Sequence, residues 1–143
     1  MIKVLKGGLH TSIQDLGRFR FRNLGVPVSG AMDTHAAKLA NVILGNSESA
    51  AVMEITLQGP QLAFQKSTTI ALTGADLSAT INDQSINLNR KIKVLKGAVV
   101  SFGRRIEGVR CYLAVEGGFK TASILGSRSQ YKGCLLYTSP SPR

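Results

Sequence analysis

Short alternations of apolar and polar residues dominate the chain and predict β-strands. In the segment 52–58 the apolar Met53, Ile55 and Leu57 alternate with polar residues, so we expect one face of this strand to be buried. Glu54 would lie on the other face, towards solvent or a cavity, and solvent is the commoner place for a carboxylate. Further strand candidates are 2–6, 61–64, 68–73, 77–81, 92–95, 98–102 and 109–115. Many short strands separated by turn signals predict a mainly β (α+β) fold, a β-barrel or a β-sandwich.

One segment, 34–44, has the spacing of an α-helix instead. Apolar residues recur there at intervals of four, three and four, which places them in one stripe on a helix. The stripe consists of Met32, Ala36, Leu39 and Ile43. Asp33 is a suitable N-cap, because its carboxylate can accept the free amides of the first turn. Gly45 followed by Asn46 is a suitable C-terminal stop. The sequence therefore predicts one amphipathic helix on a mostly β body.

The last ten residues, 134–143, match one translated reading frame of a common sequencing-library adapter, with a native Ser/Pro-rich tail as the alternative. We therefore take 1–133 as the native part and expect the chain to be the front of a longer protein. Cys111 is then the one native cysteine, which cannot form an internal disulfide or a multi-cysteine metal site. We expect an inert thiol in a strand, no metal and a reducing compartment.

Charge and hydropathy narrow the possible partners. No apolar run approaches the roughly 18 residues of a membrane span, so we expect a cytoplasmic protein with no membrane partner. The formal net charge is +10, but the cationic residues are scattered, aromatic residues make up 6% of the chain and tryptophan is absent. A base-stacking surface is therefore poorly supported, and we expect no nucleic-acid partner. The alternative, a basic nucleic-acid binder, would bind any duplex in a salt-dependent way.

Two polar stretches, 11–18 and 25–33, are candidates for chemistry. In the first, Asp15 and Arg18 lie three residues apart around a glycine, either in an ordinary turn or in a site. The second has two glycines at the spacing of a phosphate-binding loop, but it lacks the Lys and the Ser/Thr that such a loop needs. A glycine-containing loop before a helix remains, where free amides favour an anion. An ordinary capped turn is the alternative.

The strand candidate 68–73 runs into a further polar segment. Gly74 follows Thr73 there, and a glycine at that point could let the backbone approach a ligand closely. A plain turn explains the same glycine equally well.

Six motifs in chain order resemble those of the biotin-dependent carboxyltransferase family, which includes the C subunit of 5-oxoprolinase and the carboxyltransferase domain of urea amidolyase (a region similar to the second allophanate hydrolase subunit). The motifs are TSIQDLGR at 11–18, GVPVSGAMD at 25–33, LAN at 39–41 with GN at 45–46, MEIT at 53–56 with GP at 59–60, LTGAD at 72–76 and LGSRS at 125–129. The resemblance implies a cyclophilin-like β-barrel subdomain, truncated before a second barrel is complete. It departs from the family at Thr34, where many relatives have proline, and at 130–132.

The resemblance also implies a shared polar cleft. Its candidate members are Asp15, Arg18, Ser29, Gly30, Asp33, Glu54, Thr73, Gly74 and Arg128. Arg18 and Arg128 would bind a carboxylate or carboxyl phosphate, because guanidinium groups make bidentate contacts. The amides at Ser29 and Gly30 would polarise a carbonyl, and Asp15 or Glu54 would act as general base or orienting group. The remaining members, Asp33, Thr73 and Gly74, would bind substrate.

The function implied by the resemblance is that of one component of an ATP-dependent 5-oxoprolinase, which hydrolyses 5-oxo-L-proline to glutamate. Proteins similar to the A and B subunits of 5-oxoprolinase would be its partners and would help complete the ATP site. One alternative is carboxyl transfer from carboxybiotin to urea or a similar amide, with biotin supplied by a separate carrier. Another is a regulatory protein that binds a kinase inhibitor.

Overall fold

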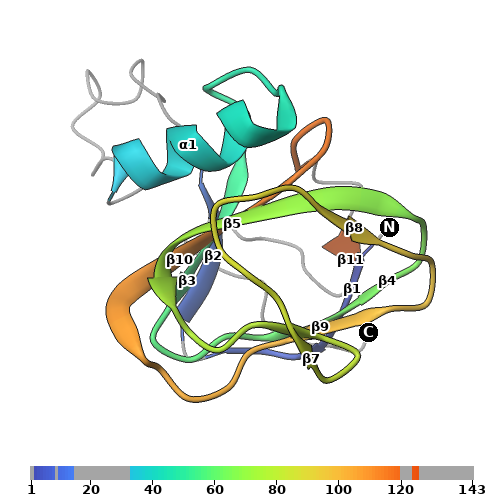
Figure 1. Cartoon of the computed structure of the whole chain (residues 1–143). Coiled ribbons are helices and arrows are strands. Elements are labelled where there is room, and N and C mark those ends of the chain that lie inside the picture. The colour runs from blue at the N-terminus through green and yellow to red at the C-terminus, as the bar shows by residue number, and fades with distance from the viewer. Residues whose placement is uncertain (1, 9, 15–32, 120–123, 126–143) are drawn as a thin grey trace.

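The computed structural model describes residues 2–8, 10–14, 33–119 and 124–125, and in them one helix covers one of two β-sheets (Figure 1). The elements are β1 (Ile2–Lys6), β2 (His10–Gln14), α1 (Thr34–Leu44), β3 (Val52–Thr56), β4 (Gln61–Phe64), β5 (Thr68–Asp76), β6 (Thr80–Ile81), β7 (Gln84–Ser85), β8 (Ile92–Val94), β9 (Val99–Ser101), β10 (Glu107–Val115) and β11 (Ile124–Leu125). No helix among the described residues is long and apolar enough to cross a membrane.

The two sheets have the strand orders β11-β1-β4-β9-β6-β7 and β2-β3-β10-β5-β8. Neighbouring strands are antiparallel, except that β1 and β11 are parallel. The mainly β class with one helix is confirmed. The described strands form two facing sheets rather than a closed hydrogen-bonded barrel, and the expected second barrel lies outside the described residues.

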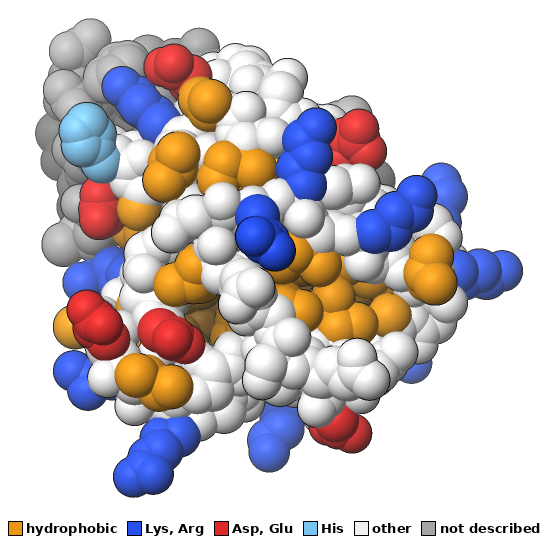
Figure 2. All heavy atoms as spheres, in the orientation of Figure 1, with side chains coloured by type: hydrophobic (Ala, Val, Ile, Leu, Met, Phe, Trp, Pro, Cys, Tyr) orange, Lys and Arg blue, Asp and Glu red, His pale blue; other side chains and the backbone are white. Residues whose placement is uncertain are grey.

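Cationic side chains do not gather in one place on the face of the molecule seen in Figure 2. Lys and Arg side chains are spread around this face, with acidic and apolar side chains between them. The scatter expected from the sequence is therefore present on this face.

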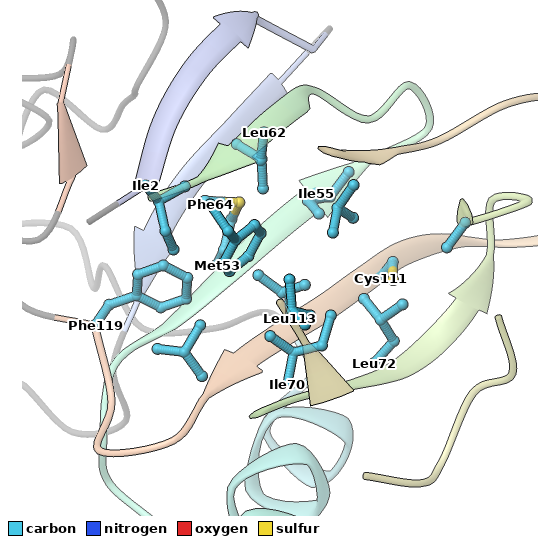
Figure 3. Packing of buried hydrophobic residues seen from close by; sticks show 14 of the residues in the cluster. Ile2, Met53, Ile55, Leu62, Phe64, Ile70, Leu72, Cys111, Leu113 and Phe119 are labelled. Atoms are coloured by element: carbon cyan, nitrogen blue, oxygen red, sulfur yellow. The ribbon is translucent and has the colours of Figure 1, made fainter. Parts of the chain in front are cut away.

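The hydrophobic core lies between the two sheets (Figure 3). Met53 and Ile55 on β3 and Leu113 on β10 meet Leu62 and Phe64 on β4, and each is at most 1% exposed. Full burial of such a side chain stabilises the fold by about 1.5–3 kcal/mol. The inward face predicted for Met53 and Ile55 is confirmed.

The same alternation fails at Leu57, because β3 ends one residue earlier, at Thr56. Leu57 has a φ of 59°, and its side chain is 37% exposed. Its amide donates to the carbonyl of Val109 at 2.8 Å, so the backbone leaves the regular ladder while keeping one bond to β10. A left-handed residue ends the alternation that the sequence pattern would have continued.

The helix begins and ends where the sequence predicts. Oδ1 of Asp33 accepts a hydrogen bond from the amide of Ala36 at 3.1 Å. Gly45 adopts a φ of 77°, which costs glycine little and other residues more. The amides of Gly45 and Asn46 donate to the carbonyls of Val42 and Asn41, so the last turn is closed by a Schellman-type motif.

The buried face of α1 differs from the predicted stripe. The buried residues are Ala37, Ala40, Asn41 and Leu44. Leu39 is 45% exposed, so its place in the apolar stripe was wrong, and Met32 lies outside the described residues. The helix packs with Val52, Ala71 and Ala114 of the five-stranded sheet. Alanines on both surfaces let the helix approach the sheet closely, whereas a pattern count favours the larger side chains.

Several strand boundaries also change. The candidate 77–81 is wrong as one strand, because only Thr80–Ile81 pair and Ser78 has a φ of 57°. The candidate 68–73 continues to Asp76 as β5. Three strands were not predicted: β2, which lies in a polar motif, and the two-residue β7 and β11.

We predict that Ala40→Leu lowers the free energy of unfolding by about 1–3 kcal/mol, because the added atoms overpack the contact between α1 and the sheet. Ala40 is 0% exposed. Lys38→Leu is the matched control, since it adds the same side chain at an exposed position of the same helix. Urea denaturation of the two variants measures the difference, and equal stabilities would contradict the packing described for α1.

Candidate functional site

A row of side chains crosses four neighbouring strands of the five-stranded sheet. Ser12 on β2 lies opposite Glu54 on β3, Glu54 lies opposite Tyr112 on β10, and Tyr112 lies opposite Thr73 on β5. Residues directly opposite one another in antiparallel strands share a face of the sheet. This face is the one that α1 covers (Figure 1). The row therefore brings together four residues far apart in the sequence, and three of its strands, β3, β10 and β5, contact the helix.

All four members of the row are buried. Ser12 is 4% exposed, Glu54 7%, and Tyr112 and Thr73 0%. A buried polar group is costly unless it is hydrogen-bonded. Each member accordingly has a partner: Ser12 Oγ accepts from Nε2 of Gln14 at 2.8 Å, and Thr73 Oγ1 donates to the carbonyl of Ala36 at 2.7 Å.

Tyr112 is the centre of the row. Its hydroxyl donates to Oε2 of Glu54 at 2.5 Å and accepts the amide hydrogen of Asp33 at 2.9 Å. A hydrogen bond to a carboxylate is shorter and stronger than one between neutral groups. One hydroxyl thus joins a strand carboxylate to the N-cap of α1.

The same surroundings keep the phenol protonated. Burial raises the pKa of Tyr112 well above its ordinary value, and the hydrogen bond to Glu54 raises it further. The bond from the Asp33 amide acts in the opposite direction and is outweighed. At neutral pH the hydroxyl therefore remains a donor to the carboxylate.

The structure brings together three of the predicted site residues and changes the interpretation of one. The Tyr112 hydroxyl joins Asp33 to Glu54, and Thr73 bonds the carbonyl of Ala36 in the first turn of α1. The expectation that Glu54 faces solvent was wrong, because the helix covers the side of β3 that alternation assigned to water. The alternation within the strand alone could not predict that a helix covers this face.

Gly74 lies inside β5 rather than at a turn, so the plain-turn alternative was wrong. Its φ is 89°, and a Cβ there would be 2.5 Å from the carbonyl oxygen of Arg110. The pairing of β5 with β10 is irregular between Glu107 and Cys111, which face this stretch of β5. The glycine is therefore required by strand packing, and close approach of a ligand to it stays a prediction.

The other predicted site residues lie outside the described part of the chain. They are Asp15, Arg18, Ser29, Gly30 and Arg128. The residues that flank the segment 15–32 are described, however. Gln14 at the end of β2 bonds Ser12 of the buried row, and Asp33 bonds Tyr112. The two described residues that flank 15–32 in the sequence therefore both bond members of the row.

Sequence reasoning missed Ser12 and Tyr112. Tyr112 lies between Cys111 and Leu113 in a strand with apolar neighbours, so alternation alone sets it on the face opposite to theirs. A tyrosine in a buried strand needs a partner for its hydroxyl, which is the signal that could have found it. Among the residues described here, no three His, Cys, Asp or Glu side chains come together as metal ligands.

Cys111 points into the core between the sheets, as the sequence predicts. Its side chain is 1% exposed, and burial, with a smaller contribution from the charge of Asp76, raises the pKa of the thiol to about 12. The thiolate is the reactive form. The folded protein therefore keeps this sulfur both inaccessible and protonated at neutral pH.

Comparison with known proteins gives consistent results. Residues 24–134 match the carboxyltransferase domain, subdomain A and B. The chain is 39% identical over 130 residues to urea amidolyase of Lachancea kluyveri, covering 90% of this chain and 7% of that protein. It is 35% identical over 129 residues to the C subunit of 5-oxoprolinase from Escherichia coli K12, covering 90% of this chain and 42% of that protein.

A solved structure with the same fold is the K. lactis urea amidolyase, with a TM-score of 0.81 and 42% identity. The match covers 91% of this chain and 8% of that one. The chain thus spans less than half the length of each of these relatives.

We predict that Cys111 in a Cys134→Ser background reacts with a thiol reagent at pH 8 about 100-fold more slowly in the folded protein than in guanidinium, because modification must await local opening and deprotonation. Absorbance of the released chromophore measures both rates. Removing Cys134 confines the signal to Cys111. Equal rates in the two states would contradict the burial described for this strand.

Proposed function

The chain belongs to the carboxyltransferase domain family, subdomain A and B, and on that premise we propose that it is part of one component of an ATP-dependent 5-oxoprolinase. Such an enzyme opens the lactam of 5-oxo-L-proline to give glutamate. The observation that carries the proposal is the buried carboxylate of Glu54, held by a tyrosine beside the first turn of a helix. The likeness to the C subunit of 5-oxoprolinase supplies the substrate class.

Glu54 would act as the general base or as the group that orients it. A general base must come within hydrogen-bond reach of the proton that it removes. Tyr112 joins Glu54 to Asp33, the described residue that follows 15–32 in the sequence, and Asp15 and Arg18 belong to that stretch of sequence. Asp15 is the alternative base, since it follows Gln14 directly in the sequence.

The remaining roles concern binding. Arg18 and Arg128 would hold the carboxylate of the substrate, because guanidinium groups bind carboxylates through two hydrogen bonds. The amides of Ser29 and Gly30 would polarise the lactam carbonyl. Thr73 is less suited to direct binding than the sequence suggested, because its hydroxyl already donates to the carbonyl of Ala36.

Partner proteins are part of the proposal. Hydrolysis of an unstrained amide is slow, so coupling to ATP through a phosphorylated intermediate is chemically reasonable. No phosphate-binding loop of the Walker type is present in the sequence. Companion proteins similar to the A and B subunits of 5-oxoprolinase would supply the rest of the nucleotide site. The relatives from two bacteria are each named as the C subunit, which agrees with such an assembly.

A second candidate is carboxyl transfer to urea or a similar amide. The identities of 39% and 42% to two yeast urea amidolyases favour it. This reaction would need biotin on a separate carrier together with a biotin carboxylase. The two candidates differ in their companion proteins, so the neighbouring genes discriminate between them. A neighbouring gene for a lactam-utilisation protein supports the first candidate, and one for a biotin carboxylase supports the second.

The direct test is an assay of the full-length protein assembled with its companion proteins. ATP hydrolysis that depends on 5-oxo-L-proline and yields glutamate supports the first candidate. Carboxylation of urea by a biotin-loaded assembly, without lactam hydrolysis, supports the second and refutes the first.

Within that assembly we predict that Arg18→Ala lowers kcat/KM for 5-oxo-L-proline by about 100-fold, since loss of a charge-assisted contact costs about 2–3 kcal/mol. Arg104→Ala is the control, because it removes the same charge from an exposed loop. Steady-state kinetics and a melting curve are measured for both variants. Unchanged kinetics in Arg18→Ala would exclude Arg18 from the site.

A further inference from the structure

We infer that Tyr112 is a positioning residue, whose hydroxyl fixes both the orientation of the Glu54 carboxylate and the start of α1. This inference rests on the proposed function for its effect on turnover, but its structural half can be tested without activity. Neither the family resemblance nor the sequence pattern singles out this residue.

The geometry of the hydroxyl makes the two roles inseparable. A phenol has one proton to donate and can accept a hydrogen bond on the same oxygen. The hydroxyl donates to Oε2 of Glu54 at 2.5 Å, and the same oxygen accepts a hydrogen bond from the amide of Asp33 at 2.9 Å. A rotated carboxylate would lose the short bond, and a displaced helix start would lose the longer one.

The ring around the hydroxyl gives the anchor its rigidity. Tyr112 is 0% exposed and packs in the cluster of Val52, Ala71 and Ala114 with the alanines of α1. It pairs with Glu54 on one side and Thr73 on the other, in the middle of the row. A fixed ring on a central strand is a better support for a site than a loop residue.

Packing alone would not require the hydroxyl. A phenylalanine would fill nearly the same volume, whereas a buried hydroxyl costs free energy unless it is satisfied. Here it is satisfied by a carboxylate and by the backbone of the N-cap, two groups that belong to the proposed site. The polar atom is therefore placed where it serves the site.

The test compares Tyr112→Phe with Glu54→Gln in the full-length protein assembled with its companions. Hydrogen exchange of the Asp33 amide should become at least about tenfold faster in Tyr112→Phe, because that amide loses its acceptor. In Glu54→Gln it should stay within about threefold of wild type, since the new amide oxygen still accepts the phenol proton. In the same assembly, kcat should fall about 10- to 100-fold in Tyr112→Phe with little change in KM, as expected for a misplaced reacting group.

Asn46→Ala is the matched control at the other end of α1. Asn46 bonds the carbonyl of Val115 and the amide of Gly117, each at 2.9 Å, so its loss removes two tethers away from Glu54. For Asn46→Ala we expect a lower melting temperature and a kcat within about twofold of wild type, since this substitution affects stability alone. If Tyr112→Phe resembles Asn46→Ala in both melting and kcat, Tyr112 is only structural and the inference is wrong.

The failure of the proposed function gives a different result from the failure of this inference. If the wild-type assembly hydrolyses no lactam, the proposed function fails, and the kcat comparison is made on carboxylation of urea. Unchanged exchange at Asp33 in Tyr112→Phe overturns the inference in either case.

Discussion

The structure depends on satisfying one polar group in an apolar layer. Between α1 and the five-stranded sheet lie mostly alanine and valine side chains, and the hydroxyl of Tyr112 is buried among them. Its bonds to Glu54 and to the amide of Asp33 offset the cost of burying that hydroxyl, and the bond to Glu54 offsets part of the cost of burying the carboxylate. If the Tyr112 hydroxyl were lost, the Asp33 amide would lose this acceptor and Glu54 would lose this donor.

The rest of the fold keeps the helix where this arrangement needs it. Ala37 and Ala40 let α1 lie close to the sheet. Thr73, on the strand β5 next to β10, donates a hydrogen bond to the carbonyl of Ala36 in the helix. At the far end Asn46 binds the backbone after β10, at Val115 and Gly117. The helix is thus attached at both ends to β10 or its continuation. The helix thereby covers the face of β3 that solvent would otherwise contact, so that this face is buried.

The sequence could predict the features that depend on local rules. The helix bounds followed from the Asp33 cap and the Gly45 stop, and the inward face of Met53 and Ile55 followed from alternation. Features set by tertiary contact could not be predicted. The spacing of apolar residues predicts neither the exposure of Leu39 nor the burial of Glu54, because each depends on which face of the helix packs against which face of the sheet. Asp33, Glu54 and Thr73 were named as site residues, but the part of Tyr112 came only from the structure. Strand register sets it between Glu54 and Thr73, and its hydroxyl bonds the Asp33 amide.

The central claim is that Tyr112 and Glu54 act as one unit. A double-mutant cycle on the free energy of unfolding tests it most directly, because such a cycle isolates the pairwise energy of Tyr112 and Glu54. Tyr112→Phe removes the donor and Glu54→Ala removes the acceptor. Because each single change removes the hydrogen bond, the account predicts a coupling of about 1–2 kcal/mol, in line with a buried hydrogen bond to a carboxylate. Strictly additive effects, with a coupling near zero, would contradict it.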